Sequence, residues 1–307
     1  MSAYLTTILI LVSEAALIGL ALNLQWGLAG LVNFGVVGFV AIGAYVTALL
    51  TLQIDWFFAL LIAAGVCGIL SMALAVLSVR LEENYLAIVT IGFGEIVRLV
   101  ILNEDWLTNG ALGIPDITRP FQSLMNTYGE SAFLVFALGL VAVVYLVLEL
   151  LFRSPFGRVL RAIRDDATVV SSLGKNVFTM RLRAFVIGGA IMGLAGGLHA
   201  FYLTYIDPSQ FTPIVTAYAF MAVIAGGRGS NLGLILGAGS IMLVLEGTRF
   251  LKDLIPALDG AQLSAIRLGM IGLGIILLLI LRPQGLVSEP RRKAREFFPD
   301  DVQEGGR

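Results

Sequence analysis

Two pairs of oppositely charged residues lie within strongly apolar stretches of the chain. Glu95 and Arg98 are three residues apart, as are Glu246 and Arg249, so each pair occupies one face of a helix. A charge at membrane depth costs at least about 2.5 kcal/mol on insertion scales and needs a partner. Each pair therefore either neutralises itself against neighbouring helices or, for Glu95 and Arg98, lies beside the route of a zwitterion with an ammonium and a carboxylate group.

Single polar residues in the apolar stretches have simpler interpretations. Asn33 stands between Val32 and Phe34. It is expected to form a hydrogen bond between helices, with a place on a transport pathway as the alternative. His199 is the chain's one histidine, and one histidine cannot form a proton relay. Packing, or a hydrogen bond near the outer surface, is therefore expected for it.

The sequence lacks the residues for enzyme chemistry. Residues 174–176 come nearest to a GxxxxGK[ST] phosphate-binding loop, but the upstream glycine and the hydroxyl are absent. One histidine and the single Cys67 cannot build a cysteine metal cluster, and there is no HExxH motif. We expect no catalytic, cofactor-binding or metal-binding residues. If ATP drives this protein, another chain must bind and hydrolyse it.

Composition indicates a membrane protein that crosses the bilayer several times. The chain has 307 residues, of which 58% are hydrophobic and 13% charged, and its mean hydropathy is +0.92. Soluble domains carry about 25% charged residues. Several runs without charge are long enough to cross roughly 30 Å of hydrocarbon as helices. The net charge of −1 gives no sign of a nucleic-acid partner.

The hydropathy pattern predicts an all-α chain with about nine transmembrane helices, and it is compatible with eight to ten. The fourth range contains two charged residues and the seventh is short, so either is a candidate for a re-entrant or broken helix. Glycines at 188–197, 35–38 and 269–274 suit close helix packing. The predicted ranges are 5–24, 31–51, 56–79, 86–102, 131–152, 183–205, 213–227, 231–251 and 263–281.

The distribution of Lys and Arg predicts the orientation of these helices. Segment 153–183 and the polar tail 291–307 are rich in basic residues, so both are expected in the cytoplasm. Four ranges separate them, and that even number agrees with the assignment. The acidic loop 103–130 and the N-terminus then lie outside. The loop is long enough to dock a soluble partner or cap a pathway, and a plain connector is equally compatible.

Segment 153–183 carries seven of the chain's twenty Lys and Arg residues, far more than a simple connector needs. Ser154 and Pro155 predict a helix start, and Asp166 predicts the cap of a second helix that runs through Leu173. Gly174 suits the end of that helix. The two helices form a polar docking surface on the water side of the membrane, with a loop that only sets topology as the alternative.

Five segments resemble one family in order along residues 10–290. They are GLAGLVNFGVVGFVAIGAY (27–45), TIGFGEIVRLV (90–100), SPFGRVLRAIRDD (154–166), GGRGSNLG (226–233) and LRPQGL (281–286). Together they resemble the LivH/LivM permeases of branched-chain amino acid ABC importers, most closely the LivM-type subunit. The Ala167 to Gly174 spacing loosely resembles the coupling loop of such permeases. The family often has an acidic residue and a small-residue pair after the Asp pair, where this chain has Ala-Thr-Val-Val at 167–170.

The resemblance implies an ABC importer permease fold, with one transmembrane domain over residues 1–290. It implies a heterodimer with a LivH-type permease, two ATPase subunits below it, and a periplasmic or tethered substrate-binding protein, in the lipid of a bacterial or archaeal cytoplasmic (inner) membrane. The substrate is expected to be Leu, Ile or Val. The expected ATPase-coupling residues are Arg158, Arg161, Arg164, Asp165, Asp166, Ala167 and Gly174.

Two other functions stay open at this point. Permeases of the same family that carry urea, short amides or other amino acids have hardly distinguishable sequences. An autonomous channel or ion-coupled carrier needs no ATPase partner and predicts uptake by the purified chain alone. A membrane enzyme is poorly supported, because no motif supplies a nucleophile, a base or a metal.

Overall fold

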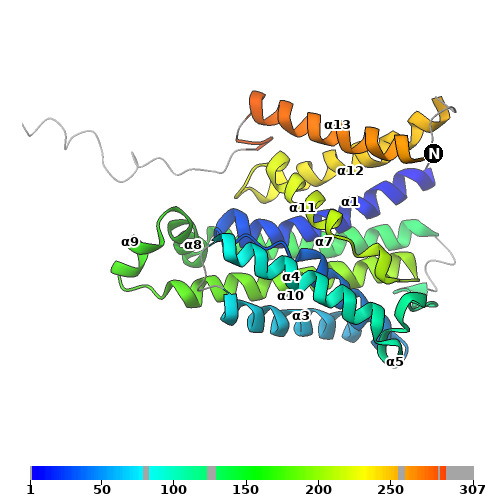
Figure 1. Ribbon diagram of the computed structural model, residues 1–307, viewed down its shortest axis with the longest axis horizontal. Helices are drawn as coiled ribbons and strands as arrows, with labels where there is room; N and C mark the ends of the chain where they lie inside the picture. Colours follow the sequence, from blue (N-terminus) through cyan, green and yellow to red (C-terminus); the bar gives the residue numbers. More distant parts are fainter. Residues whose placement is uncertain (1, 79–82, 123–128, 255–259, 283, 288–307) are drawn as a thin grey trace, which may run out of the picture.

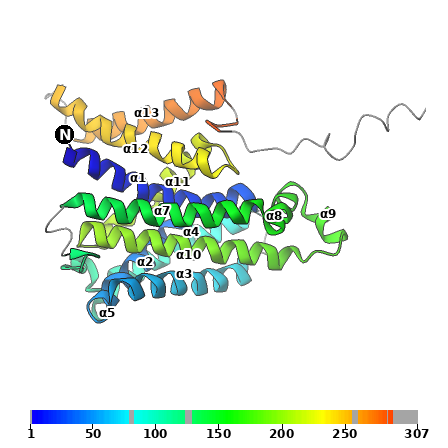
Figure 2. The same ribbon diagram turned by 180° about the vertical axis from the view of Figure 1, so that it is seen from behind.

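The computed structural model describes residues 2–78, 83–122, 129–254, 260–282 and 284–287. Within these residues the backbone forms helices and no strand, apart from one isolated bridge between Ile114 and Ile206. The long helices run side by side along one direction (Figure 1, Figure 2). They are α1 (Ser2–Leu22), α2 (Val36–Thr51), α3 (Trp56–Ser78), α4 (Glu83–Asn103), α7 (Glu130–Arg153), α10 (Val177–Leu203), α11 (Pro213–Gly226), α12 (Asn231–Leu254) and α13 (Gly260–Leu281).

Each range predicted from hydropathy falls on one of these helices, which confirms an all-helical chain. Among the described residues, six helical segments are long and apolar enough to cross a bilayer, and two shorter apolar helices cover Val36–Thr51 and Asn231–Gly247. The total of nine spans therefore stays a prediction. The six segments are Tyr4–Leu28, Trp56–Leu77, Tyr85–Asn103, Glu130–Arg153, Val177–Leu203 and Pro208–Gly226.

Helix α10 forms the centre of the bundle and packs against α1, α2 and α3. Its glycines allow main chains to approach closely, because a Cβ added at Gly196 would lie 2.0 Å from the Val40 carbonyl oxygen of α2. A Cβ at Gly43 of α2 would lie 2.4 Å from the Gly193 carbonyl oxygen of α10. The packing role predicted for the glycines at 188–197 is confirmed. For the glycines at 269–274, no heavy atom would lie within 4 Å of an added Cβ.

The polypeptide leaves the α-helical conformation between α1 and α2. A wide π-helix, η1 (Asn23–Leu28), follows α1, and residues 29–35 are not helical. Gly30 has a φ of +71°, which a side chain would disfavour. The predicted range 31–51 therefore begins its helix later, at Val36. Irregular backbone at membrane depth is tolerated only where protein buries it or where it lines a cavity. We call residues 23–35 the break.

Helices α8 (Pro155–Asp165) and α9 (Ala167–Ser172) project from one end of the bundle (Figure 1). We call them the docking helices, after the role that the sequence predicts for them. Their predicted caps are confirmed. The Ser154 hydroxyl accepts a hydrogen bond from the Gly157 amide, and the Asp166 carboxylate accepts from the amides of Thr168 and Val169. Gly174 has a φ of +75° just after α9, as expected of a glycine that ends a helix.

At the other end of the bundle, residues 103–122, the described part of loop 103–130, fold back onto the end of α10 and the residues that follow it. The loop contains α5 (Asp105–Thr108) and the short 3-10 helix η2 (Gly110–Leu112). The Ile114 amide donates to the Ile206 carbonyl at 2.9 Å, and the Arg119 guanidinium donates to the Tyr202 carbonyl at 2.7 Å. The loop is therefore packed against its own chain.

Candidate functional site: a broken helix joined to the docking helices

The break carries three polar side chains that are fully buried: Asn23, Gln25 and Asn33. The Asn33 side-chain amide donates to the Gln25 side-chain oxygen at 2.8 Å, and the Asn33 oxygen accepts from the Gly35 amide at 2.9 Å. The Gln25 amide in turn donates to the Phe185 carbonyl of α10 at 2.9 Å. Since buried polar groups are costly without partners, this chain of bonds fixes the break on the central helix.

Asn23 connects the same break to the opposite side of the bundle. Its side-chain oxygen accepts from the Gly229 amide at 2.9 Å, and its side-chain nitrogen donates to the Asn231 oxygen at 3.2 Å. Asn231, the first residue of α12, donates to the Glu149 carboxylate of α7 at 3.1 Å. These hydrogen bonds, from three separate parts of the sequence, tie α7, α12 and the break together.

Two threonines bind main-chain amides at the end of the break. The Phe34 amide donates to the Thr90 hydroxyl of α4 at 2.9 Å, and the Val37 amide donates to the Thr216 hydroxyl of α11 at 3.2 Å. These amides would lack intrahelical partners at the start of α2. The end of the break is therefore held by α4, and the start of α2 by α11.

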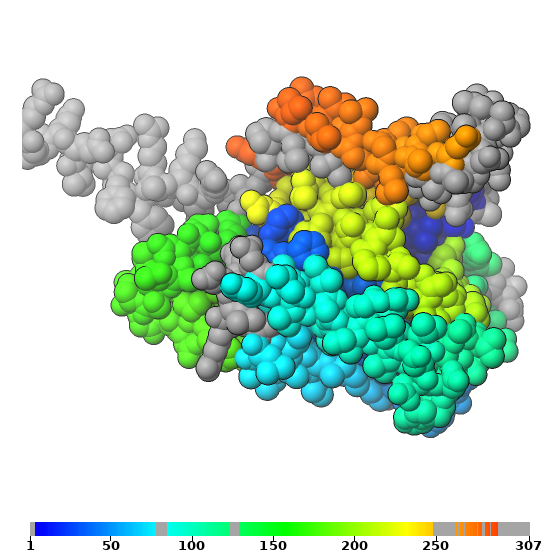
Figure 3. All heavy atoms as spheres, in the orientation of Figure 1, coloured from blue at the N-terminus to red at the C-terminus, as the bar shows by residue number. Residues whose placement is uncertain are grey.

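An aromatic cluster covers the break on one face of the molecule. The Phe34 ring stacks on Phe220 of α11 with ring centres 4.5 Å apart, and Trp26 lies 5.0 Å from the same ring. The guanidinium of Arg228 is 4.9 Å from the Trp26 ring centre. Phe34 is 36% exposed although the residues on either side of it are buried. Figure 3 shows atoms of the blue, N-terminal part of the chain at the surface, between cyan α4 and yellow α11 and α12.

Arg164 of α8 reaches the break from the docking helices. Its guanidinium donates to the Gly27 carbonyl oxygen at 2.5 Å. The Arg164 side chain also packs on Gly30, where an added Cβ would lie 3.2 Å from the arginine Cγ. The carbonyls at the end of a helix lack intrahelical partners and attract cations. Arg164 therefore caps η1 and joins the docking helices to the break.

The other predicted coupling residues lie elsewhere on α8 and α9. Arg158 is exposed and donates to the Arg153 carbonyl, whereas Arg161 is partly buried and donates to the Phe152 carbonyl at 3.1 Å. The Asp165 side chain is 72% exposed and accepts from Arg164. Asp166 and Gly174 are exposed, and Ala167 is half-buried. Two apolar side chains on the same tip are exposed: Val169 and Leu173.

The predicted pathway residues are not gathered in one place. Glu95 and Arg98 pair on α4, with the guanidinium Nε 3.1 Å from the carboxylate, and both are partly exposed. Asn33 is buried within the break. Glu246 is buried on α12, and its main-chain carbonyl accepts from the Tyr4 hydroxyl at 3.1 Å. The side chain of Arg249 lies outside the described residues.

A partly buried polar triad joins residues that the sequence presents as unrelated. His199 Nδ1 lies 2.9 Å from a Glu14 carboxylate oxygen, and His199 Nε2 lies 3.2 Å from the Gln210 side-chain oxygen. Glu14 and His199 are 185 residues apart in the chain. Asn23 and Gln25 were missed in the same way, and the only available signal was their polarity within an apolar run. No group of three or more His, Cys, Asp or Glu suited to a metal ion occurs in the part of the chain searched.

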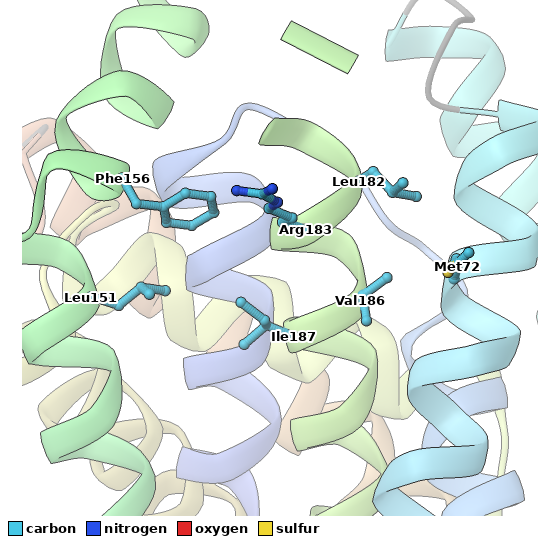
Figure 4. A pocket seen from close by; sticks show the side chains of 7 residues that line it. All are labelled: Met72, Leu151, Phe156, Leu182, Arg183, Val186 and Ile187. Atoms are coloured by element: carbon cyan, nitrogen blue, oxygen red, sulfur yellow. The ribbon is translucent and has the colours of Figure 1, made fainter. Parts of the chain in front are cut away.

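A separate pocket lies beside the docking helices. Its volume is about 400 Å³, and seven side chains from α3, α7, α8 and α10 line it (Figure 4). Six of them are apolar, and the seventh is Arg183. Its lining residues are Met72, Leu151, Phe156, Leu182, Arg183, Val186 and Ile187.

Comparison with known proteins finds one family over nearly the whole chain. The family described as "Branched-chain amino acid transport system / permease component" matches residues 4–281. The high-affinity branched-chain amino acid permease protein LivM of Escherichia coli (strain K12) is 36% identical over 300 residues, which cover 90% of this chain and 68% of the relative. No solved structure gives a significant match.

Two further relatives extend the likeness to another domain of life and to the sister subunit. The probable LivM of Methanocaldococcus jannaschii is 30% identical over 316 residues, covering 89% of this chain and 90% of the relative. LivH of E. coli (strain K12) is 27% identical over 307 residues, which cover 91% of this chain and 92% of the relative. The chain therefore belongs to the permease-component family of branched-chain amino acid transport systems, as a multi-pass membrane protein and not an enzyme.

Proposed function

We propose that the chain is the LivM-type permease subunit of an ATP-driven importer for leucine, isoleucine and valine. The names of its relatives support this substrate class. The subunit pairs with a LivH-type permease, two ATPase subunits bind below it, and an external binding protein delivers the amino acid. ATP is bound by the ATPase chains, since this sequence has no phosphate-binding loop. The docking helices and the C-terminal tail face the cytoplasm and the N-terminus faces outside.

The bond between Arg164 and Gly27 carries the mechanistic part of the proposal. Helices α8 and α9 stand outside the bundle, whereas Gly27 belongs to the broken helix inside it. A displacement of α8 by the ATPases is transmitted to the break through this bond. The path from Glu149 through Asn231 to Asn23 links the same break to α7, the helix that precedes α8. The two connections move the break and the docking helices together.

The tip of α8 and α9 is the ATPase-docking surface in this proposal. Val169 and Leu173 expose apolar surface there, while Arg158 and Asp165 supply exposed charges of both signs. A loop that only set topology would need its basic residues but no exposed apolar ones. Apolar anchors surrounded by charged groups are typical of protein interfaces. The 167–170 stretch, which departs from the usual family pattern, contains one of these anchors.

The substrate route follows the face between α4 and α11. Phe34 is exposed on this face at the break, and the Glu95–Arg98 pair of α4 is partly exposed. A zwitterionic amino acid needs transient partners for its ammonium and carboxylate groups, which the pair can supply. Asn33 holds the break in place and does not contact substrate. Irregular backbone that borders a cavity is the usual construction of transport sites at membrane depth.

Reconstitution with the partner chains tests the function. Proteoliposomes are prepared with the chain, a LivH-type permease, two ATPases and the binding protein. They are expected to take up radioactive leucine only when ATP is present on the side of the membrane where the ATPases bind. Unlabelled isoleucine and valine should compete, and urea should not. Uptake by the purified chain alone under an ion gradient would show an autonomous carrier instead. Competition by urea but not by valine would place the chain with an importer for amides.

A further inference from the structure

The pocket of Figure 4 is an apolar groove, and the cation of Arg183 stands beside it. The groove is formed by side chains from four helices: Met72 of α3, Leu151 of α7, Phe156 of α8 and Ile187 of α10. Arg183 is exposed and lies between Phe156 and Leu182 in the view of Figure 4. The cavity of about 400 Å³ is within the size of ligand-binding pockets.

The Arg183 guanidinium lacks a partner in the described part of the chain. No hydrogen bond or ion pair joins it to any described residue. Two other arginines of segment 153–183 do have partners: Arg153 pairs with Glu149 at 2.8 Å, and Arg164 binds the Gly27 carbonyl. Guanidinium groups bind phosphate oxygens through two parallel N–H donors, and Arg183 is exposed to such a ligand.

The surroundings of the groove are those of a lipid-facing surface. On α3, Val76 and Leu77 are exposed, and on α7, Val147 and Leu150 are exposed. An apolar groove that opens onto such a surface contacts hydrocarbon in a bilayer. Arg183 lies near the start of α10, and α10 begins at the end of the bundle that carries α8 and α9. The cation is therefore placed at headgroup depth and the groove at acyl-chain depth.

We propose that this pocket binds an anionic glycerophospholipid, with an acyl chain in the groove and the phosphate on Arg183. An acyl chain alone would leave the guanidinium unpaired, and a free phosphate would leave the groove empty. An anionic lipid fills the groove with an acyl chain and pairs the guanidinium with its phosphate. Basic pockets between transmembrane helices on the cytoplasmic side are known to bind anionic headgroups, and the cytoplasmic leaflet supplies such lipids. The site does not depend on which substrate the permease carries.

The lipid has a structural consequence for the docking helices. Phe156 lies in the first turn of α8, and its ring lines the groove together with Leu182 and Ile187 of α10. An acyl chain between these side chains adds contacts between α8 and α10. The bound lipid thereby steadies the docking helices against the bundle.

Native mass spectrometry of the purified chain tests the site. The probes are phosphatidylglycerol and phosphatidylcholine with identical acyl chains, each added to the delipidated full chain in detergent. The wild-type chain is expected to retain phosphatidylglycerol preferentially. Arg183→Gln should lower that retention about fivefold, the factor for about 1 kcal/mol from one basic residue near anionic lipid. Met72→Trp, which fills the groove and keeps the charge, should also lower it.

The matched control is Arg158→Gln, because Arg158 is also exposed at this end of the bundle but does not line the pocket. It should retain phosphatidylglycerol as the wild type does. Equal retention of the two lipids by the wild type, or unchanged retention in Arg183→Gln, would overturn the proposal. So would displacement of the lipid by millimolar inorganic phosphate, which would reveal a site for phosphate alone. Cross-linking of the Met72→Cys variant to another subunit in the reconstituted complex would identify a protein interface and overturn the proposal.

Discussion

Arg164 differs from the other arginines of α8 in what its side chain contacts. Arg158 and Arg161 donate to carbonyls at the end of α7, immediately before their own helix. Arg164 donates to Gly27, which is 137 residues away in sequence. In our proposal, Arg164 belongs to a cytoplasmic helix, and its positive side chain caps the end of an intramembrane helix. A single side chain is thus shared by the two parts of the protein that must move together.

Asn23 is expected to contribute to stability because it satisfies buried groups on two other elements. Asn23→Ala removes its bonds to Gly229 and Asn231, and an unsatisfied buried polar group costs about 1–3 kcal/mol. The unfolding midpoint of the detergent-solubilised protein should fall. Asn103→Ala is the matched control, because the Asn103 side chain is exposed and bonds only within its own helix. Equal midpoints for the two variants would contradict a structural role for the Asn23 network.

The Glu95–Arg98 pair is expected to act in transport and not in folding. The pair is partly exposed and self-contained on α4, so Glu95→Gln should leave the protein level unchanged. Uptake should fall about tenfold, as expected from the loss of one charge-assisted hydrogen bond of about 1.5 kcal/mol. Glu104→Gln, in the loop after α4, is the control and should transport normally. Normal uptake by Glu95→Gln at normal protein level would show that the pair only neutralises itself.

At the scale of elements, the contact between α2 and α10 determines how tightly the bundle packs. A Cβ at Gly196 would lie 2.0 Å from a main-chain oxygen of α2, so Gly196→Ala forces the helices apart. Overpacking of this kind costs typically about 1–3 kcal/mol. The yield of folded protein and its unfolding midpoint should both fall. Gly139→Ala on α7 is the matched control, since no heavy atom lies within 4 Å of its added Cβ, and an equal effect of the two changes would contradict the packing account.

The elements that the sequence predicts well are those with local signals. Long apolar runs locate the helices, and Ser154, Asp166 and Gly174 mark the ends of α8 and α9, because caps depend on residues within one turn. The delayed start of α2 was not predicted, since residues 29–35 are as apolar as a helix. The bonds of Asn23, Gln25 and Arg164 were not predictable either. Their partners are far away in sequence, and only the folded bundle brings them together.

At the scale of the whole molecule, the two ends of the bundle differ and the break lies between them. One end carries α8, with its arginines, and α9, and the other carries the described part of loop 103–130, folded onto the end of α10 and the residues after it. Hydrogen bonds join the break to α4, α8, α10, α12 and the segment before α12. Asn231 links it further to α7, and the Phe34 ring packs on α11. Because so many elements meet there, rigid-body movement of any of them changes the break. This arrangement suits alternating access, in which one region must respond to both sides of the membrane.

The measurement that tests this account most directly is the number of ATP molecules hydrolysed per leucine imported by the reconstituted complex. Arg164→Gln removes the bond to the Gly27 carbonyl but leaves the exposed tip of α8 and α9 intact. ATPase subunits should still bind and hydrolyse ATP while uptake falls, so the ratio should rise about tenfold for a charged hydrogen bond of about 1.5 kcal/mol. Arg158→Gln keeps the Gly27 bond and changes only the docking surface, so it should lower ATP hydrolysis and uptake together and leave their ratio near the wild-type value. An unchanged ratio in Arg164→Gln, with normal uptake, would contradict transmission through the break.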